Sequence, residues 1–290
     1  MPAHGADPRQ RGMRLRSLLF VPADRPERFG RAAASGADAI ILDLEDSVAA
    51  ERKASARVAA AECLSARRDV TTFVRINPLD GGLARTDLDA VLPASPDGLV
   101  LPKAEGAASI ETLLTLIGGR RAPPILPIAT ETPAAIFELG SYRMATTHLA
   151  GLTWGAEDLP AAIGASTSRE EDGRYTAPYE MVRSLTLFGA HAAGVPAIET
   201  VFPRIDAPDA LAAYVARARR DGFSGMMAIH PTQVEAINSG FSPTQEEIAR
   251  ALAIVEAFAA QPGVGAIQLD GRMIDRPHLI QARRILAIEE

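Results

Sequence analysis

Cysteine is almost absent from this sequence, since Cys63 is the only one in 290 residues. One thiol can form neither an internal disulfide nor a metal site built from several thiolates, so both kinds of stabilisation are excluded. A chain without disulfides suits a reducing compartment, and we expect a cytoplasmic protein.

An excess of basic charge and long apolar runs are also missing. The formal net charge is −6, and because nucleic acids and anionic membranes are bound by basic surfaces, we expect neither as a partner. No apolar run is long enough to span a bilayer, and no secretory segment is evident. The first predicted strand is not followed by G-x-G-x-x-G, which argues against a dinucleotide-binding fold.

The sequence does contain a repeated alternation of short apolar runs and alanine-rich helical stretches. Most of the runs are continuously apolar, which is typical of parallel strands covered on both faces. Eight strands with helices between them predict an α/β fold, a (β/α)8 TIM barrel, with a doubly wound open sheet as the alternative. The expected strands are Ser17–Val21, Ala39–Leu42, Thr71–Ile76, Gly98–Leu101, Ile125–Ala129, Leu149–Trp154, Ala197–Phe202 and Gly225–Ile229.

We expect three regions along the chain. Residues 1–12 are polar and small and predict a flexible tail, and residues 13–240 form the predicted barrel. Residues 241–290 predict a C-terminal helical extension or lid, with Ser242 as a candidate N-cap of its first helix.

Polar residues stand at the ends of nearly all the predicted strands. In a (β/α)8 barrel the chemistry takes place where strands meet the loops that follow them, so this placement predicts an active site at that face, although charged loops are common. The residues concerned are Asp43, Glu45, Asp46, Arg75, Asn77, Lys103, Glu131, Thr132, Glu157, Asp158, Glu199 and His230.

Glu131 and Asp158 follow the fifth and sixth predicted strands. Neighbouring strands lie roughly 5 Å apart, so two carboxylates placed there could share one hard cation such as Mg²⁺, with water and substrate oxygens completing the coordination. Each acid could instead cap the helix that follows it, because TETP and EDLPAA both look like helix starts. The spacing leaves these two interpretations equally open.

The basic residues near this face also have two interpretations each. Arg75 could hold a substrate carboxylate in bidentate fashion or form a salt bridge at the barrel rim. Lys103 could bind a phosphate or carboxylate, or neutralise the acids. Lys53 and Arg57 are spaced like neighbours on a helix and indicate a solvated ion-pair face. His230 has no second His or Cys near it in the sequence, so we expect a hydrogen-bonded structural role.

Taken together and in order, these residues resemble the CitE-like branch of the HpcH/HpaI aldolase/citrate lyase family. The resemblance runs from about Arg16 to Leu286 and rests on RSLLFVPADRPERF, DLEDSV, VRINPLD, VLPKAE, ATETPAAI, LTWGAEDLPAAIG, AIHPTQ and DGRMIDRP. It implies a (β/α)8 barrel with Mg²⁺ as cofactor that assembles as a homotrimer or hexamer. It also implies making or breaking a carbon–carbon bond between an acyl thioester and a 2-oxo acid.

The resemblance gives roles to the residues around the predicted metal. Glu131 and Asp158 match the direct Mg²⁺ ligands, and Glu131 also contacts the substrate. Arg75 matches the arginine that grips the oxo-acid carboxylate. Glu45 and Asp46 match acids that hold metal-bound waters.

The resemblance also implies roles for residues further away. Asp43 supports the acids that hold the waters, or has a structural role at the strand end. Asp275, in GRMID, matches an aspartate on a C-terminal lid that reaches a neighbouring subunit's site, and it is our candidate acid/base. Arg16, Lys53 and Lys103 fall in or near the region that binds CoA and balances charge.

We therefore expect a Mg²⁺-dependent carbon–carbon lyase or synthase that acts on malyl-CoA, citramalyl-CoA or a related CoA ester. The alternatives are a citrate lyase β subunit acting on a citryl thioester of an acyl carrier protein, a metal-dependent aldolase acting on free hydroxy-oxo acids, and a non-catalytic binding protein. The complete set of acids argues against the last, because a retired site would tolerate the loss of Glu131 or Asp158.

Overall fold

The computed structural model describes residues 13–287, so the tail predicted at 1–12 lies outside the described residues. The chain divides into two compact units, Met1–Asn238 and Ser239–Glu290. The boundary predicted from the sequence, at residue 240, falls inside helix α9 (Val234–Phe241).

Eight parallel strands form the first unit. Their order is β5-β4-β3-β2-β1-β8-β7-β6, so each strand pairs with its neighbours in sequence and β1 pairs with β8. Bridges between Ile125 and Leu149 and between Ile128 and Thr153 join β5 to β6 and close the sheet. The (β/α)8 TIM barrel is therefore confirmed. The strands are β1 (Ser17–Pro22), β2 (Ala39–Asp43), β3 (Thr71–Arg75), β4 (Gly98–Leu101), β5 (Ile125–Pro127), β6 (Leu152–Thr153), β7 (Ala197–Glu199) and β8 (Gly225–Ala228).

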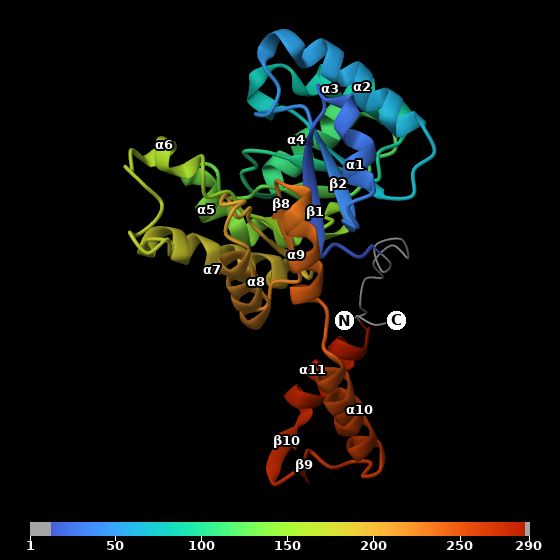
Figure 1. Ribbon diagram of the computed structural model, residues 1–290, viewed down its shortest axis with the longest axis vertical. Coiled ribbons are helices and arrows are strands. Elements are labelled where there is room, and N and C mark those ends of the chain that lie inside the picture. Colours follow the sequence, from blue (N-terminus) through green and yellow to red (C-terminus); the bar gives the residue numbers. More distant parts are fainter. Residues whose placement is uncertain (1–12, 288–290) are drawn as a thin grey trace. The chain divides into compact units, whose positions relative to one another are not determined.

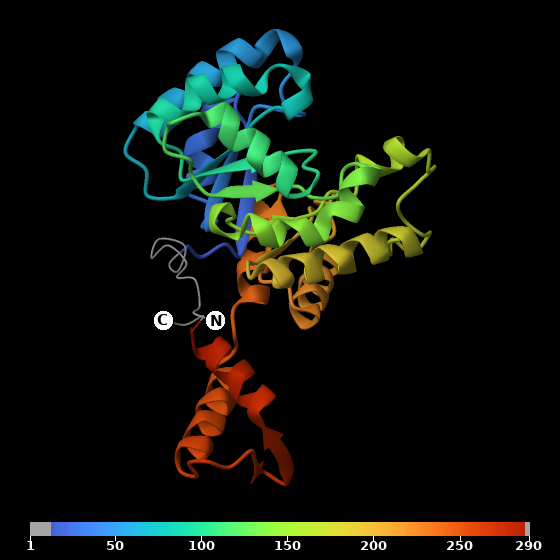
Figure 2. The ribbon, with the colours of Figure 1, turned by 180° about the vertical axis from the view of Figure 1, so that it is seen from behind.

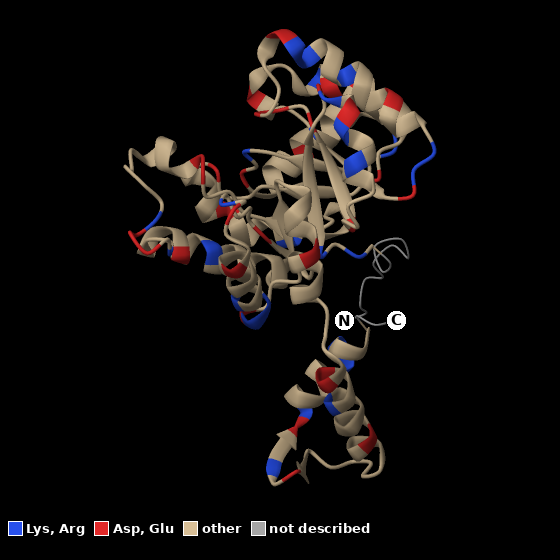
Figure 3. Ribbon diagram, viewed as in Figure 1, with Lys and Arg blue, Asp and Glu red and all other residues tan. Residues whose placement is uncertain are grey.

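Helices lie outside the strands, as Figure 1 and, from behind, Figure 2 show. Basic and acidic residues are interspersed over the helices in Figure 3. Within residues 13–287, none of the helices combines the length and the apolar character needed to cross a membrane. The helices of this unit are α1 (Phe29–Ala33), α2 (Lys53–Ser65), α3 (Ala84–Val91), α4 (Gly106–Ile117), α5 (Pro133–Glu138), α6 (Leu159–Ile163), α7 (Ala177–Ala193) and α8 (Pro208–Asp221).

The barrel interior is filled by side chains that point inward from alternate positions of the strands. Leu18, Ile41, Phe73, Val100 and Ile198 belong to one buried cluster, so the centre of the barrel is a packed core and not a channel. The Phe73 ring lies where a side chain on Gly98 would stand, because a Cβ there would be only 2.1 Å from the ring.

Several strands are shorter than their apolar runs predict. The run Ile125–Ala129 contributes only Ile125–Pro127 to the ladder, and Leu149–Trp154 contributes only Leu152–Thr153. Beyond the carboxyl ends of these two strands the chain enters loops. These loops carry Glu131 and Asp158.

The second unit is not purely helical, contrary to the prediction. Helices α10 (Gln245–Ala259) and α11 (Arg276–Ala287) accompany an antiparallel hairpin of β9 (Ala266–Leu269) and β10 (Arg272–Asp275). The hairpin turn is Asp270–Gly271, where both residues have positive φ, and Asp-Gly is the dipeptide that favours such turns. Apolar side chains including Ile254, Ile267 and Ile274 form the small core of this unit.

The N-cap predicted for α10 was wrong. Thr244, and not Ser242, caps this helix: its side chain accepts the Glu247 N–H, and the Glu247 side chain accepts the Thr244 N–H. This reciprocal pair satisfies two free donors of the first turn.

Candidate active site

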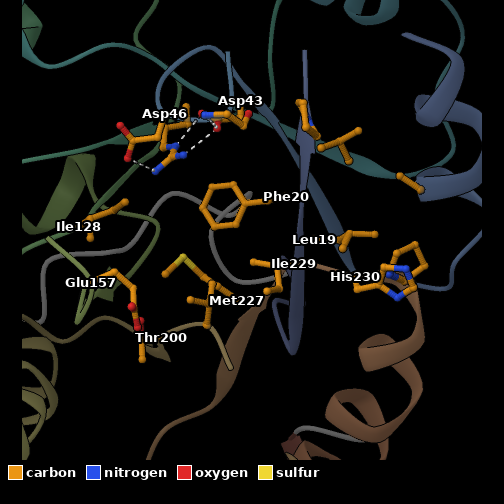
Figure 4. Close-up of a pocket in the computed structure, with 18 of the residues that line it drawn as sticks. Leu19, Phe20, Asp43, Asp46, Ile128, Glu157, Thr200, Met227, Ile229 and His230 are labelled. Carbon is orange, nitrogen blue, oxygen red and sulfur yellow. Dashed lines mark hydrogen bonds and ion pairs between the residues drawn. The ribbon is translucent and has the colours of Figure 1, made fainter. Parts of the chain in front are cut away.

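A cavity of about 770 Å³ opens at the carboxyl ends of the barrel strands. Its lining includes five of the acids singled out in the sequence, Asp43, Asp46, Glu131, Glu157 and Asp158, together with Arg75. Figure 4 shows Asp43 and Asp46 on one side of Phe20, and Glu157 with Thr200 on the other. The face predicted from the strand ends is thus the face that holds the cavity.

Arg75, the last residue of β3, is fixed from two sides. Its Nε and Nη2 donate to the two oxygens of Asp43, both at 2.6 Å, and its guanidinium lies 4.8 Å from the centre of the Phe20 ring. Burial alone would lower the pKa of Arg75, but the hydrogen bonds to Asp43 and the charge of Glu45 raise it. The guanidinium therefore stays charged in a largely dry place.

Asp43 is the support for this arginine. Besides Arg75, its oxygens accept the backbone N–H groups of Glu45 and Ser47 at 2.9 and 3.1 Å. Burial would raise the pKa of Asp43, but the Arg75 hydrogen bonds lower it below its usual value. Asp43 is therefore an ionised, fully bonded carboxylate whose position is set by the turn after β2.

Glu45 and Lys103 link Arg75 to the metal-ligand candidates. Glu45 lies 2.8 Å from Arg75 Nη1 and 2.9 Å from Lys103 Nζ, and Lys103 Nζ lies 3.7 Å from Asp158 Oδ1. Burial would lower the pKa of Lys103, but the hydrogen bond to Glu45 and the charge of Asp158 raise it. A chain of alternating charges thus runs from β3 to the loop after β6.

Glu131 is the buried acid at the centre of the site. Only 4% of its surface is exposed, and its Oε2 accepts the Lys103 backbone N–H at 2.6 Å. Burial, and then the nearby charges of Asp158 and Glu45, raise the pKa of Glu131 to about 8. The surroundings of Glu131 therefore disfavour its ionised form, and a bound cation would stabilise that form. This is the behaviour expected of a carboxylate in a cation-binding site.

The loops that carry Glu131 and Asp158 are joined to each other. The Gly155 N–H donates to Thr130 Oγ1 at 3.1 Å, so the residue before Glu131 is bonded to the start of the loop that holds Asp158. This bond keeps the two acids on the same side of the cavity, as the strand spacing predicted.

The charges in the site suit a divalent cation. When all five are ionised, the acids Asp43, Glu45, Asp46, Glu131 and Asp158 outnumber by three the basic side chains that face them, Arg75 and Lys103. Within residues 13–287, three or more His, Cys, Asp or Glu side chains are nowhere grouped to hold a metal ion. An ion between Glu131 and Asp158 would take its remaining ligands from water and substrate, which is usual for Mg²⁺.

The raised pKa of Glu131 predicts how the stability of the metal-free protein varies with pH. The folded pKa of about 8 exceeds the usual glutamate value of 4.5, so the stabilising contribution is complete below pH 4.5 and is lost as pH rises through 8. Between pH 5 and 8, the free energy of unfolding of the metal-free wild type should fall by on the order of a few kcal/mol more than that of Glu131→Gln. Denaturant unfolding of both proteins at several pH values in EDTA tests this, and parallel curves would contradict it.

Two predicted substrate-binding residues lie away from the cavity lining. Arg16 precedes β1 at the opposite, amino end of the barrel, where its Nε and Nη2 donate to Asp38. The part in CoA binding that the resemblance implies for Arg16 stays a prediction. Lys53 Nζ donates to the carbonyls of Leu44 and Glu45, where it holds the turn after β2.

The solvated face predicted for Lys53 and Arg57 was also wrong. Arg57 donates to Asp87 at 2.6 Å, and Asp87 is fully buried. Helix α2 therefore turns both cations toward the barrel, because the buried carbonyls and Asp87 need donors that water cannot supply there.

His230 and Asp275 complete the set of predicted residues. His230 Nδ1 lies 2.7 Å from Thr232 Oγ1, in agreement with a structural role, but His230 also lines the cavity. Asp275 ends β10 in the second unit, and its Oδ1 lies 2.5 Å from His278 Nδ1. This hydrogen bond lowers the pKa of Asp275.

The sequence interpretation missed two contributors to the site. Phe20 supports Arg75, and Gly155 leaves room for Glu131. Glu199 was grouped with the site acids, yet it is fully buried and bonded to Arg183 and Trp154. Only the glycine had a visible signal, since it stands three residues before Asp158 in the G-x-E-D-L element.

The chain matches two protein-family models and resembles well-described proteins along nearly its whole length. The model for HpcH/HpaI aldolase/citrate lyase matches residues 16–231, and the model for C-C bond lyases of the TIM-barrel fold matches residues 176–289. The citrate lyase subunit beta-like protein of Deinococcus radiodurans is 33% identical over 283 residues, 95% of this chain and 97% of that protein. The (3S)-malyl-CoA thioesterase of Cereibacter sphaeroides is 32% identical over 293 residues, 99% of this chain and 97% of that protein.

Solved structures of similar proteins point the same way. CitE of Mycobacterium tuberculosis in complex with magnesium, acetoacetate and coenzyme A matches with a TM-score of 0.82 and 34% identity, over 97% of this chain and 100% of that chain. CitE of the same organism with magnesium and pyruvate matches with a TM-score of 0.75 and 32% identity, over 96% and 99% of the two chains. The protein is therefore a lyase that belongs to the HpcH/HpaI aldolase/citrate lyase family.

Proposed function

We propose that the protein is a Mg²⁺-dependent carbon–carbon lyase that cleaves or forms a 3-hydroxyacyl-CoA, such as malyl- or citramalyl-CoA, from an acyl-CoA and a 2-oxo acid. The observation that carries this proposal is the convergence of Glu131, Asp158 and Arg75 on one cavity. The proposal is supported by similar CitE structures that contain magnesium with pyruvate, or magnesium with coenzyme A and acetoacetate.

Glu131 and Asp158 are the residues that would hold Mg²⁺, as the excess of negative charge around them suggests. The ion would supply stabilisation of the negative charge that develops on oxygen when the carbon–carbon bond breaks or forms. Glu45, bonded to Lys103 and paired with Arg75, would keep the neighbouring cations in place. Asp46, which is exposed to the cavity, would accept hydrogen bonds from water there.

Arg75 would bind the carboxylate of the 2-oxo acid. Asp43 accepts hydrogen bonds from Nε and from one N–H of Nη2 of Arg75, and Glu45 lies beside Nη1. Each terminal nitrogen of Arg75 therefore keeps an N–H for a ligand. Two parallel N–H groups match a carboxylate, and Asp43 and Phe20 fix their direction before the ligand arrives. The oxo acid would then meet the thioester in a set orientation.

The other part of the cavity suits a thioester with a phosphorylated carrier. Leu19, Phe20 and Ile229 line it with apolar surface, and the exposed Arg28 and Arg31 also line it. Arginine side chains bind phosphate groups well. These residues are the ones that we propose contact the CoA.

The acid/base would come from a second copy of the chain. We propose that Asp275 serves this role in a homotrimer or hexamer, because the deprotonated form favoured by His278 can accept a proton. In cleavage the base takes the hydroxyl proton, the carbon–carbon bond breaks, and its electrons pass to the thioester enolate, which then takes a proton.

A panel of 3-hydroxyacyl-CoAs, incubated with the protein and Mg²⁺, tests the proposal. We expect at least one to release an oxo acid together with acetyl-CoA or propionyl-CoA. The matching thioester on an acyl carrier protein and free hydroxy-oxo acids are included, because cleavage of these alone would favour a citrate lyase β subunit or an aldolase. Cleavage of none of them would favour a non-catalytic binding protein.

The support that Asp43 gives to Arg75 predicts the effect of two conservative changes. Arg75→Lys removes the two parallel N–H groups of the guanidinium, and Asp43→Asn weakens the hydrogen bonds that fix their direction. In each variant, KM for the 2-oxo acid in the synthesis direction should therefore rise roughly 10–100-fold. KM for the acyl-CoA should hardly change. A larger effect on the acyl-CoA than on the oxo acid, measured by initial rates, would contradict the assignment.

A further inference from the structure

Glu131 is held by two features that play no part in the chemistry. The first is the backbone of Lys103, whose φ of +50° is rare for a residue with a side chain. This conformation points its N–H at Glu131 Oε2, at a distance of 2.6 Å. A strained residue beside a candidate metal ligand is an observation that calls for a functional reason.

The second feature is the space at Gly155. A Cβ added there would lie 2.8 Å from Glu131 Cγ and 3.1 Å from Oε1, which is too close for the present position of the glutamate. The backbone of Gly155 is not in the left-handed region, so alanine would suit its conformation. The requirement for glycine here is therefore one of space only.

Together these features leave one oxygen of Glu131 available to a ligand. Oε2 is engaged by Lys103, whereas Oε1 lies beside Gly155 at the cavity wall, without a donor among the described residues. Mg²⁺ has a small, strict octahedral shell, whereas Ca²⁺ is larger and readily takes both oxygens of a carboxylate. A glutamate fixed to offer one oxygen suits the smaller ion.

We propose that Gly155 and the left-handed backbone of Lys103 are positioning residues that restrict Glu131 to a single ligating oxygen and so make the site selective for Mg²⁺ over Ca²⁺. This inference rests on the proposed function, because it assumes that Glu131 binds the cation. It adds the source of the selectivity, which lies in two residues that do not touch the ion.

Calorimetric titration of the metal-free protein with Mg²⁺ and with Ca²⁺ tests the role of Gly155 without measuring activity. In Gly155→Ala, the dissociation constant for Mg²⁺ should rise about tenfold or more, since the methyl group displaces Glu131. The constant for Ca²⁺ should change less, so that the preference for Mg²⁺ falls. Gly140→Ala is the matched control, because a Cβ at Gly140 meets nothing within 4 Å, and its affinities should equal those of the wild type.

Two substitutions of Lys103 test the backbone separately. Lys103→Gly and Lys103→Val both remove the ammonium group, but only valine opposes a φ of +50°. The preference for Mg²⁺ is the dissociation constant for Ca²⁺ divided by that for Mg²⁺. We expect this ratio to be several-fold smaller in the valine variant than in the glycine variant. Thermal melts of both variants check that they are folded. If Lys103→Val does not fold, Lys103→Thr, which also introduces a branched side chain, is used in its place.

The results separate this inference from the proposed function. If the wild type binds no Mg²⁺, or binds it equally well after Glu131→Gln, the proposed metal site fails and the inference fails with it. If Glu131→Gln abolishes binding but Gly155→Ala keeps the wild-type affinity, or loses Mg²⁺ and Ca²⁺ affinity equally, only the inference is overturned. Equal preference in the glycine and valine variants overturns the part assigned to Lys103.

Discussion

Replacing Glu131 with glutamine is expected to lower Mg²⁺-dependent turnover by about 10³-fold or more, because it removes one of two protein ligands from the site where charge develops. The loss should not come from unfolding. At neutral pH, below its pKa of about 8, Glu131 is mostly protonated in the metal-free protein. A neutral glutamine of the same shape can still accept the Lys103 N–H and needs no proton from the solvent, so the melting temperature in EDTA should not fall below that of the wild type.

The wild type and Glu131→Gln should therefore differ in their response to the ion. Added Mg²⁺ should raise the melting temperature of the wild type, since binding to the folded state stabilises it, and should leave the variant unchanged. Asp158→Asn should behave in the same way, although Asp158 is about one-third exposed and its loss also removes a partner of Lys103. Near-wild-type turnover in either variant, with Mg²⁺ titrated to saturation, would contradict the ligand assignment.

The sequence predicted the barrel because eight continuously apolar runs at regular intervals have few other ways to be covered. It also placed Asp43, Arg75, Glu131 and Asp158 at one face, since parallel strands all present their carboxyl ends there. What it could not resolve was the choice between a metal ligand and a helix cap. That choice depends on burial, and the burial of Glu131 is set by residues from neighbouring strands.

Side-chain directions were the least predictable part. Lys53 and Arg57 have the spacing of a solvated pair, yet both turn inward, Lys53 to a carbonyl after β2 and Arg57 to the buried Asp87 of α3. Spacing along a helix says which residues share a face, and only the tertiary fold says what that face meets. The roles of Phe20 and Gly155 were missed for the same reason, because each acts on a residue from another strand.

The hairpin of the second unit, in contrast, had a sequence signal. Asp270–Gly271 between two apolar runs is a strong indication of a tight turn between strands. Reading this segment as part of a helical extension overlooked it. The turn matters for function, because β10 ends at Asp275, the proposed acid/base.

Replacing Asp275 with asparagine is expected to reduce turnover by roughly 10²–10⁴-fold, the range for a general base, while Mg²⁺ and oxo-acid affinities stay the same. The carboxylate is ionised, as a proton acceptor must be, since the hydrogen bond from His278 lowers its pKa. Asparagine keeps the shape and the contact with His278 but cannot take the proton. Binding titrations with Mg²⁺ and pyruvate provide the readout, and an equal loss of oxo-acid affinity would show that Asp275 binds substrate instead.

Mixing two inactive variants tests whether Asp275 acts on a neighbouring copy. In a ring where each C-terminal unit serves the next barrel, a chain with Asp275→Asn keeps a working metal site, and a chain with Glu131→Gln keeps a working base. Random reassembly of equal amounts would make about a quarter of the sites complete, so roughly a quarter of the wild-type activity should return. If Asp275 acted on its own barrel, every chain would lack one essential group, and mixing after unfolding and refolding would restore nothing.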